Sequence, residues 1–256
     1  VSVDAPVNHQ TTPGGVFDGV VRVNIGSAQG NFLGSGVLLP SGRHVLTAAH
    51  NITGAFPDPV LTNLTVSVTF ELPSGNIVTS VTAATVPGDW NRDLLNGSDW
   101  AVLELANVAP NNVPRYDIYR DTNEIYTVGL KAGYGQGGQN LAILPAGVKR
   151  QGENRYEAFL GNNNKQDILL FDFDNGIAAN DTFGILGIDP NLGEGNNEVL
   201  NARGDSGGPT FINGLVAGIT SFFARDPSGG DIDGVLNSSI GEFGGDTRVS
   251  SFANAI

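Results

Sequence analysis

Residues 204–209 read Gly-Asp-Ser-Gly-Gly-Pro, and this short stretch decides how the rest of the chain is interpreted. Glycine adopts backbone conformations that other residues resist, so a serine among glycines can stand at a sharp turn with its hydroxyl exposed. An acyl-transfer enzyme needs such a nucleophile beside backbone N–H donors for the developing oxyanion. The alternative is a structural turn in a chain that contains 36 glycines. Ser206 is therefore a candidate nucleophile that requires a base elsewhere in the chain.

Two upstream segments contain the partners that such a serine requires. Residues 47–50 read Thr-Ala-Ala-His, and residues 98–103 read Ser-Asp-Trp-Ala-Val-Leu. A serine hydroxyl is a weak nucleophile near neutral pH, so it needs a base such as His50 and an acid such as Asp99 that fixes the tautomer of that base. The order His, Asp, Ser excludes the subtilisin order and the α/β-hydrolase order of the same groups.

Together the three segments resemble the trypsin/chymotrypsin family of serine peptidases. The resemblance implies catalytic roles for His50, Asp99 and Ser206. Asp89 and Asp93 also lie between the histidine and the second half of the chain. Asp99 is preferred because an aliphatic segment follows it at once, as in the family's Asp-Ile-Ala-Leu-Leu motif.

The resemblance assigns two further roles to the nucleophile segment. The backbone N–H groups of Gly204 and Ser206 would form the oxyanion hole. The carboxylate of Asp205 would be buried and would need a partner, since an unpaired buried charge costs several kcal/mol. Val1 is one candidate, as an aliphatic N-terminal amine, and an internal partner is the other, because the family's Ile-Val-Gly-Gly start is missing.

The chain lacks a cystine that in the family usually links a strand of the first barrel to the residue after the histidine. Gly34 and Asn51 stand at those two places, so packing must replace the covalent link. Weaker support for the resemblance comes from residues 133–135, which read Gly-Tyr-Gly where the family has Gly-Trp-Gly.

The substrate pocket is the least determined part of the resemblance. Trypsins have an aspartate six residues before the nucleophile, and Leu200 occupies that position here. Glu198 or Asp246 could supply a displaced negative charge, or both could be solvated surface acids. The side-chain preference, basic or small and apolar, therefore stays open. The residues implied to bind substrate are Leu200, Arg203, Ser221, Phe222, Phe223 and Asp246.

The composition limits the partners and the location of the protein. The formal net charge of -13 would repel the phosphates of nucleic acid. No apolar run approaches the length of a membrane span. Methionine is absent even at position 1, which favours a processed chain that is secreted or periplasmic. We expect a monomer that acts on protein or peptide substrates and that protein protease inhibitors could bind.

Alternation of apolar and polar residues, as over residues 61–71, together with many glycines and β-branched residues, predicts an all-β chain. The resemblance implies two six-stranded antiparallel β-barrels of the chymotrypsin type, with the triad in the cleft between them. The expected divisions are a lead-in over 1–15 with His9 on the surface, a first barrel over 16–107, a connection over 108–124, a second barrel over 125–246 and an amphipathic C-terminal helix over 247–256.

Residues 172–176 read Asp-Phe-Asp-Asn-Gly, which is part of a calcium-loop pattern. The full pattern of oxygen ligands ending in a glutamate is missing, so an acidic turn is the competing interpretation. Structural calcium at Asp172 and Asp174 is thus a side hypothesis, and the triad chemistry itself requires no metal or cofactor.

The sequence predicts an active serine endopeptidase that works through an acyl-enzyme intermediate. The alternative from another class is a catalytically silent homologue that acts as a protein-binding module. An esterase using the same triad would differ only in its pocket.

Overall fold

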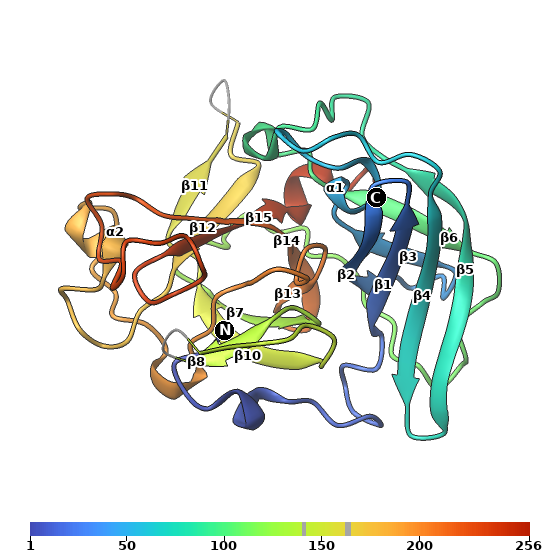
Figure 1. Ribbon diagram of the computed structural model, residues 1–256, viewed down its shortest axis with the longest axis horizontal. Coiled ribbons are helices and arrows are strands. Elements are labelled where there is room, and N and C mark those ends of the chain that lie inside the picture. Colours follow the sequence, from blue (N-terminus) through green and yellow to red (C-terminus); the bar gives the residue numbers. More distant parts are fainter. Residues whose placement is uncertain (140–141, 162–164) are drawn as a thin grey trace.

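Strands dominate the protein, and they form two units that lie beside each other (Figure 1). The computed structural model describes residues 1–139, 142–161 and 165–256. Within these residues the α-helices are α1 (His50–Thr53) and α2 (Thr182–Ile185), so no helix there is long enough to cross a membrane. The prediction of an all-β chain is confirmed.

The first unit is a closed six-stranded barrel in the order β1-β2-β3-β6-β5-β4, with antiparallel neighbours throughout. Period-two alternation builds it, because Val21, Val23 and Ile25 of the first strand all face its apolar interior. The first of the two expected barrels is thus present. Its strands are β1 (Val20–Ser27), β2 (Gly30–Leu38), β3 (His44–Thr47), β4 (Thr65–Leu72), β5 (Gly75–Thr85) and β6 (Ala101–Leu105).

The second unit is a seven-stranded antiparallel sheet in the order β10-β7-β13-β14-β15-β12-β11, and it is not closed. A closed second barrel of six strands was expected. In the described residues the edge of β10 instead makes isolated bridges to Gln10 and Glu198. The strands are β7 (Val128–Gly133), β10 (Arg150–Arg155), β11 (Ala158–Leu160), β12 (Ile168–Asp172), β13 (Pro209–Ile212), β14 (Leu215–Ala224) and β15 (Phe243–Arg248). A separate two-stranded antiparallel sheet pairs β8 (Gly137–Gln139) with β9 (Ala142–Leu144).

The C-terminal segment differs from the helix expected over residues 247–256. Thr247 pairs with Ile168 and Ile219 as part of β15, so strand pairing overrides the helical spacing at the start of the segment. A 3-10 helix, η5 (Val249–Phe252), follows the strand. The apolar face itself was correctly placed, since Val249 is buried and the ring of Phe252 lies 5.9 Å from that of Trp100.

One apolar cluster joins the two units. It combines side chains of the barrel with side chains of the seven-stranded sheet, and its buried members include Val20, Val37, Leu46, Ala132, Phe211 and Ile219. The candidate active site lies at this junction. The lead-in packs on the second unit, with Ser2 bridging to Val199. His9 is buried there and its Nδ1 lies 2.9 Å from the Gln151 carbonyl oxygen, so the expectation of a surface histidine was wrong.

Candidate active site

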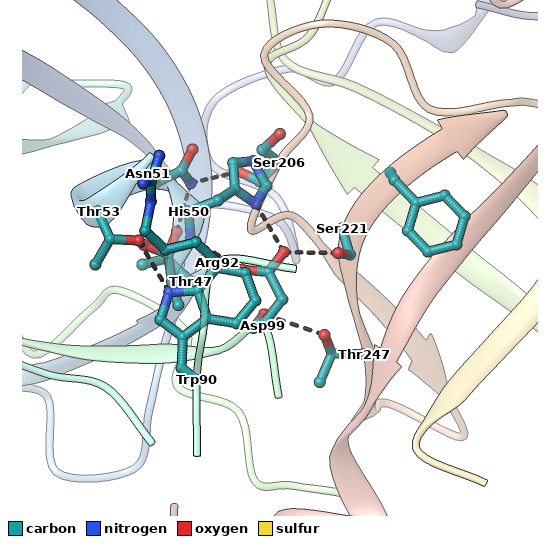
Figure 2. A network of polar contacts seen from close by, with 12 residues as sticks. Thr47, His50, Asn51, Thr53, Trp90, Arg92, Asp99, Ser206, Ser221 and Thr247 are labelled. Atoms are coloured by element: carbon teal, nitrogen blue, oxygen red, sulfur yellow. Dashed lines mark hydrogen bonds and ion pairs between the residues drawn. The ribbon is translucent and has the colours of Figure 1, made fainter. Parts of the chain in front are cut away.

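Pairing of β3 with β6 brings the candidate base and its acid together. Thr47, at the end of β3, lies opposite Ala101, at the start of β6, so the residues just beyond these two emerge at the same end of the barrel. His50 Nδ1 lies 2.7 Å from Asp99 Oδ2, and the backbone N–H of His50 donates to Asp99 Oδ1 at 2.9 Å. Two bonds to one carboxylate therefore fix the position and the orientation of the imidazole (Figure 2).

Asp99 is fully buried, and the second unit completes its hydrogen bonding. Ser221 on β14 donates its hydroxyl to Asp99 Oδ2 at 2.6 Å, and Thr247 on β15 donates to the Asp99 carbonyl at 3.1 Å (Figure 2). Ser221 was expected to bind substrate, and its contact with Asp99 was not foreseen. The alternative acids are engaged elsewhere: Asp89 accepts from the Ser98 hydroxyl, and Asp93 caps a 3-10 helix, η2 (Leu94–Asn96).

The pKa of His50 reflects two opposing effects. Burial alone lowers this pKa, because it disfavours the charged imidazolium. The charge of Asp99 and its hydrogen bond together outweigh burial and raise the pKa of His50 above its ordinary value. The arrangement thus stabilises an imidazolium that forms when the ring accepts a proton.

The nucleophile segment precedes β13 and is fixed by contacts with the barrel. The Ser206 carbonyl accepts hydrogen bonds from the Ser35 N–H and from the side-chain amide of Asn51, both at 2.8 Å. Asn51 follows His50 directly, and Figure 2 shows Ser206 beside the His50 ring. Within the described residues no hydrogen bond joins the Ser206 hydroxyl to His50. Such contacts often tighten only when substrate binds.

Backbone geometry around Ser206 leaves two donors free. Gly204 adopts a φ of +101°, in the region that favours glycine, and its carbonyl accepts from the Ser35 hydroxyl at 2.9 Å. The N–H of Asp205 donates to the Ala202 carbonyl. In the described part of the chain, the N–H groups of Gly204 and Ser206 donate to no protein acceptor. These are the two donors that the family resemblance implies for an oxyanion hole.

Asp205 is held by internal backbone donors. Its carboxylate accepts from the Gly135 N–H at 2.7 Å and from the Ala202 N–H at 2.9 Å. Burial raises its pKa, and the Val1 amine opposes that rise. That amine donates to the Leu200 carbonyl at 2.9 Å, and among the described residues it forms no ion pair within 4.0 Å. The pairing of Val1 with Asp205 therefore stays a prediction.

Close packing explains the Gly-Tyr-Gly segment. A Cβ atom at Gly133 or at Gly135 would lie 2.3 Å from a carboxylate atom of Asp205. Glycine is required at both positions because the carboxylate occupies the space of a side chain. Asn51 likewise fills the place of the missing cystine, since a Cβ at Gly34 would lie 2.6 Å from its amide nitrogen.

The expected pocket residues fall into two groups. Ser221, Phe222 and Phe223 are consecutive on β14, and the Phe222 ring approaches Gly245 so closely that a Cβ there would lie 2.3 Å from it. Arg203 is exposed. Leu200, by contrast, is buried in the apolar core of the second unit.

Neither candidate for a displaced pocket charge is a solvated acid. Asp246 is fully buried, and its Oδ2 accepts from Lys131 Nζ at 2.6 Å, from the Tyr156 hydroxyl at 2.6 Å and from the Thr210 hydroxyl at 2.5 Å. Glu198 is also buried, and its Oε2 accepts from the backbone of the loop that precedes it. The two calcium candidates, Asp172 and Asp174, lie in the second unit and are likewise buried.

No family model matches this sequence, and no curated protein matches it either.

Proposed function

We propose that this chain is a serine endopeptidase that resembles the trypsin/chymotrypsin family. The observation that carries the proposal is the contact of a half-buried His50 with a fully buried Asp99 at the junction of the two units. Ser206 lies beside them, and the N–H groups of Gly204 and Ser206 have no protein acceptor among the described residues. A closed six-stranded barrel with a further sheet is compatible with the fold of that family. In this proposal the open seven-stranded sheet corresponds to the second barrel.

The mechanism follows from the order of proton transfers. Ser206 Oγ attacks the carbonyl carbon of the scissile peptide bond, and the hydroxyl proton passes to the free ring nitrogen of His50. The N–H groups of Gly204 and Ser206 stabilise the oxyanion, each contributing about 10²–10³ in rate. His50 then donates the proton to the leaving amine as the C–N bond breaks. Water then attacks the acyl carbon while His50 accepts its proton, and His50 passes that proton to Ser206 Oγ as the ester C–O bond breaks and the carboxylic acid product leaves.

The role of Asp99 in this mechanism is to hold His50 with Nδ1 protonated, so that the other ring nitrogen is free to accept. Ser221 positions Asp99 rather than the substrate, because it donates to the same carboxylate oxygen that His50 contacts. Substrates in this proposal are proteins or peptides, and the side-chain preference remains open. Secretion or periplasmic location, inhibition by protein protease inhibitors and a monomeric state stay predictions.

The test is labelling with a fluorophosphonate probe, with the modified residue identified by mass spectrometry. Stoichiometric label on Ser206 that is lost in His50→Ala supports the proposal. The matched control is Ser228→Ala, which removes an exposed serine and should leave labelling unchanged. Cleavage-site profiling of a peptide library with the wild-type protein then defines the pocket.

Absence of label on folded wild-type protein would count against an active peptidase and for the catalytically silent homologue. Circular dichroism and a cooperative melting transition establish that the tested protein is folded. Label without cleavage of any library peptide, together with hydrolysis of small esters, would identify an esterase instead.

A further inference from the structure

Three buried carboxyl groups meet in the second unit, away from the triad residues. Glu157, Asp172 and Asp174 are 4%, 1% and 2% exposed. One carboxylate oxygen from each lies within 4.8 Å of the others. The calcium-loop pattern in the sequence contains the two aspartates but not Glu157, which precedes them by more than a dozen residues.

Strand geometry explains how the three groups meet. Asp172 ends β12 and Asp174 follows two residues later, so their side chains start on the same side of the extended chain. Glu157 immediately precedes β11, which pairs with β12 through Ala158 and Leu170. The Asp172 N–H donates to Glu157 Oε2 at 3.2 Å, which ties the glutamate to the end of β12. The glutamate that the calcium-loop pattern lacked is thus supplied by a neighbouring strand.

Among the residues that the structure describes, no protein cation neutralises this cluster. Among the described residues, no Lys, Arg or His nitrogen lies within 4.0 Å of any of the three carboxylates. Asp174 Oδ1 is buried and has no hydrogen-bond partner in the described structure. A buried carboxylate oxygen without a donor is costly, and a bound cation is a standard way to satisfy it.

We propose that Glu157, Asp172 and Asp174 bind a structural calcium ion. Carboxylate oxygens without histidine or cysteine are the ligands of hard cations. Calcium bonds to oxygen at about 2.3–2.6 Å, so two of its ligands are separated by at most about 5 Å. The spread of 4.8 Å fits within that limit. Magnesium, at about 2.0–2.1 Å, requires a tighter cage, with opposite ligands about 4.2 Å apart.

The loop over residues 193–198 contacts this site and leads to the nucleophile segment. Gly193 packs against Asp174 with a φ of +86°, and a Cβ there would lie 2.7 Å from the Asp174 side chain and 3.2 Å from that of Glu198. Glu198 itself holds the loop through its bond from the Glu194 N–H at 2.7 Å. The chain runs from this loop directly to residues 204–209. Calcium would therefore stabilise the loop that precedes the Ser206 segment.

Shared protons are the alternative way to neutralise the cluster. Burial, followed by the charge of Asp172, raises the pKa of Glu157 to about 10 and that of Asp174 to about 9. A metal-free cluster would hold protons at neutral pH, and calcium would have to displace them. The two states are distinguished by direct metal binding.

The experiment uses the full chain carrying Ser206→Ala, so that self-cleavage and activity play no part. Protein is treated with EGTA, desalted and titrated with CaCl₂ by isothermal calorimetry, and its melting temperature is measured with and without calcium. We expect one ion per chain and, at about 100 times the dissociation constant, a rise in melting temperature of about 5–10 °C. Magnesium at the same concentration should produce a smaller rise.

The variants Asp174→Asn and Glu157→Gln keep the shape of each side chain and remove its charge. Each should keep its melting temperature in EGTA and lose the calcium response, and having two variants guards against one that fails to fold. Asp121→Asn, at an exposed position outside the cluster, is the matched control and should respond like the parent. The proposal is overturned if the parent shows no heat of binding and no shift, or if both cluster variants respond as fully as the control.

Discussion

The side-chain amide of Asn51 donates a hydrogen bond to the backbone carbonyl of Ser206 at 2.8 Å, so the residue after the candidate base holds the candidate nucleophile. The same amide donates to the Thr47 hydroxyl at 3.0 Å. Gly34 provides the space for this side chain. At the place where the resembled family has a cystine within the first barrel, this chain has a hydrogen bond that joins the two units.

Replacing Asn51 with alanine should weaken this connection. The Ser206 carbonyl keeps its bond from Ser35, so the loss in free energy of unfolding is about 1–2 kcal/mol, which includes the small cavity. The rate of labelling by the fluorophosphonate probe should fall by about tenfold, because the serine loop loses a positional constraint. Asn112→Ala, at an exposed position, is the control. Equal labelling rates for both variants would contradict a positioning role for Asn51.

The raised pKa of His50 predicts where activity is lost in acid. The general base must be neutral, so kcat/KM should fall as pH decreases through a pKa above about 6.5, the ordinary value for histidine. In Asp99→Asn the charge that raises the pKa is gone and burial remains, so this limb should move to lower pH. The rate at the plateau should fall by about 10⁴, because the tautomer is no longer fixed. An acid limb that does not move would show that another group controls it.

Ser221→Ala tests the support that the second unit gives to Asp99. The variant removes the donor at 2.6 Å from Oδ2, while both contacts between His50 and Asp99 remain possible. We expect kcat to fall by about tenfold with KM little changed, since one charge-assisted hydrogen bond is lost. If Ser221 acts only on substrate, KM should rise and kcat should stay constant.

The buried pair of Lys131 and Asp246 predicts a stability effect rather than a change in substrate preference. Lys131→Met leaves Asp246 without a cation in the core and should lower the free energy of unfolding by about 3–5 kcal/mol. Adding Asp246→Asn should restore part of the loss. The control is Lys165→Met, whose side chain is 50% exposed and whose ion pair with Asp89 should be worth about 0–1 kcal/mol. Urea denaturation measures all of these variants.

The ion pair of Lys131 and Asp246 also bears on whether Asp246 selects basic substrate side chains. If Asp246 supplied the negative charge of the substrate pocket, Asp246→Asn would lose cleavage of Arg and Lys substrates by orders of magnitude. Because the carboxylate is already bound by Lys131, we expect the ratio of basic to apolar cleavage sites to stay constant in the peptide library. A selective loss of cleavage at Arg and Lys sites in Asp246→Asn would instead show that Asp246 contacts the substrate side chain.

Site residues that lie in local sequence motifs could be predicted from the sequence. Contacts between residues far apart in the sequence could not. His50 and Asp99 were found because each lies in a recognisable segment, and β3–β6 pairing then brings them together. Asp246 is different, since its partner Lys131 is 115 positions away and no local pattern indicates that either is buried. Glu157 was missed for the same reason.

Secondary structure was mispredicted where tertiary pairing overrode local preference. The helical spacing over residues 247–256 correctly placed the apolar side chains, yet Thr247 and Arg248 pair as a strand. Closure of the second sheet depends on how its edges meet, and alternation within a single strand carries no information about that. The first barrel was predictable because consecutive segments there form consecutive pairs, as in β1–β2 and β4–β5.

Gly207 combines an unusual backbone conformation with close packing against the barrel. Its φ is +84°, and a Cβ there would lie 2.1 Å from the Thr47 hydroxyl oxygen and 2.3 Å from the Ser35 carbonyl oxygen. Gly214 provides the matched control, since its φ is +79° and a Cβ there meets nothing within 4 Å. Gly214→Ala should therefore cost only the strain of the left-handed conformation, about 1–2 kcal/mol.

Gly207→Ala should cost considerably more than its control, because the barrel and the nucleophile loop must separate to admit the methyl group. Since the backbone of Ser35 and the β3 end cannot move as flexible side chains do, we expect loss of labelling at Ser206 even where the variant still folds. Thermal melts and probe labelling of the two alanine variants measure both effects. Similar melting temperatures for the two variants would show that the loop is not packed against the barrel as tightly as these distances require.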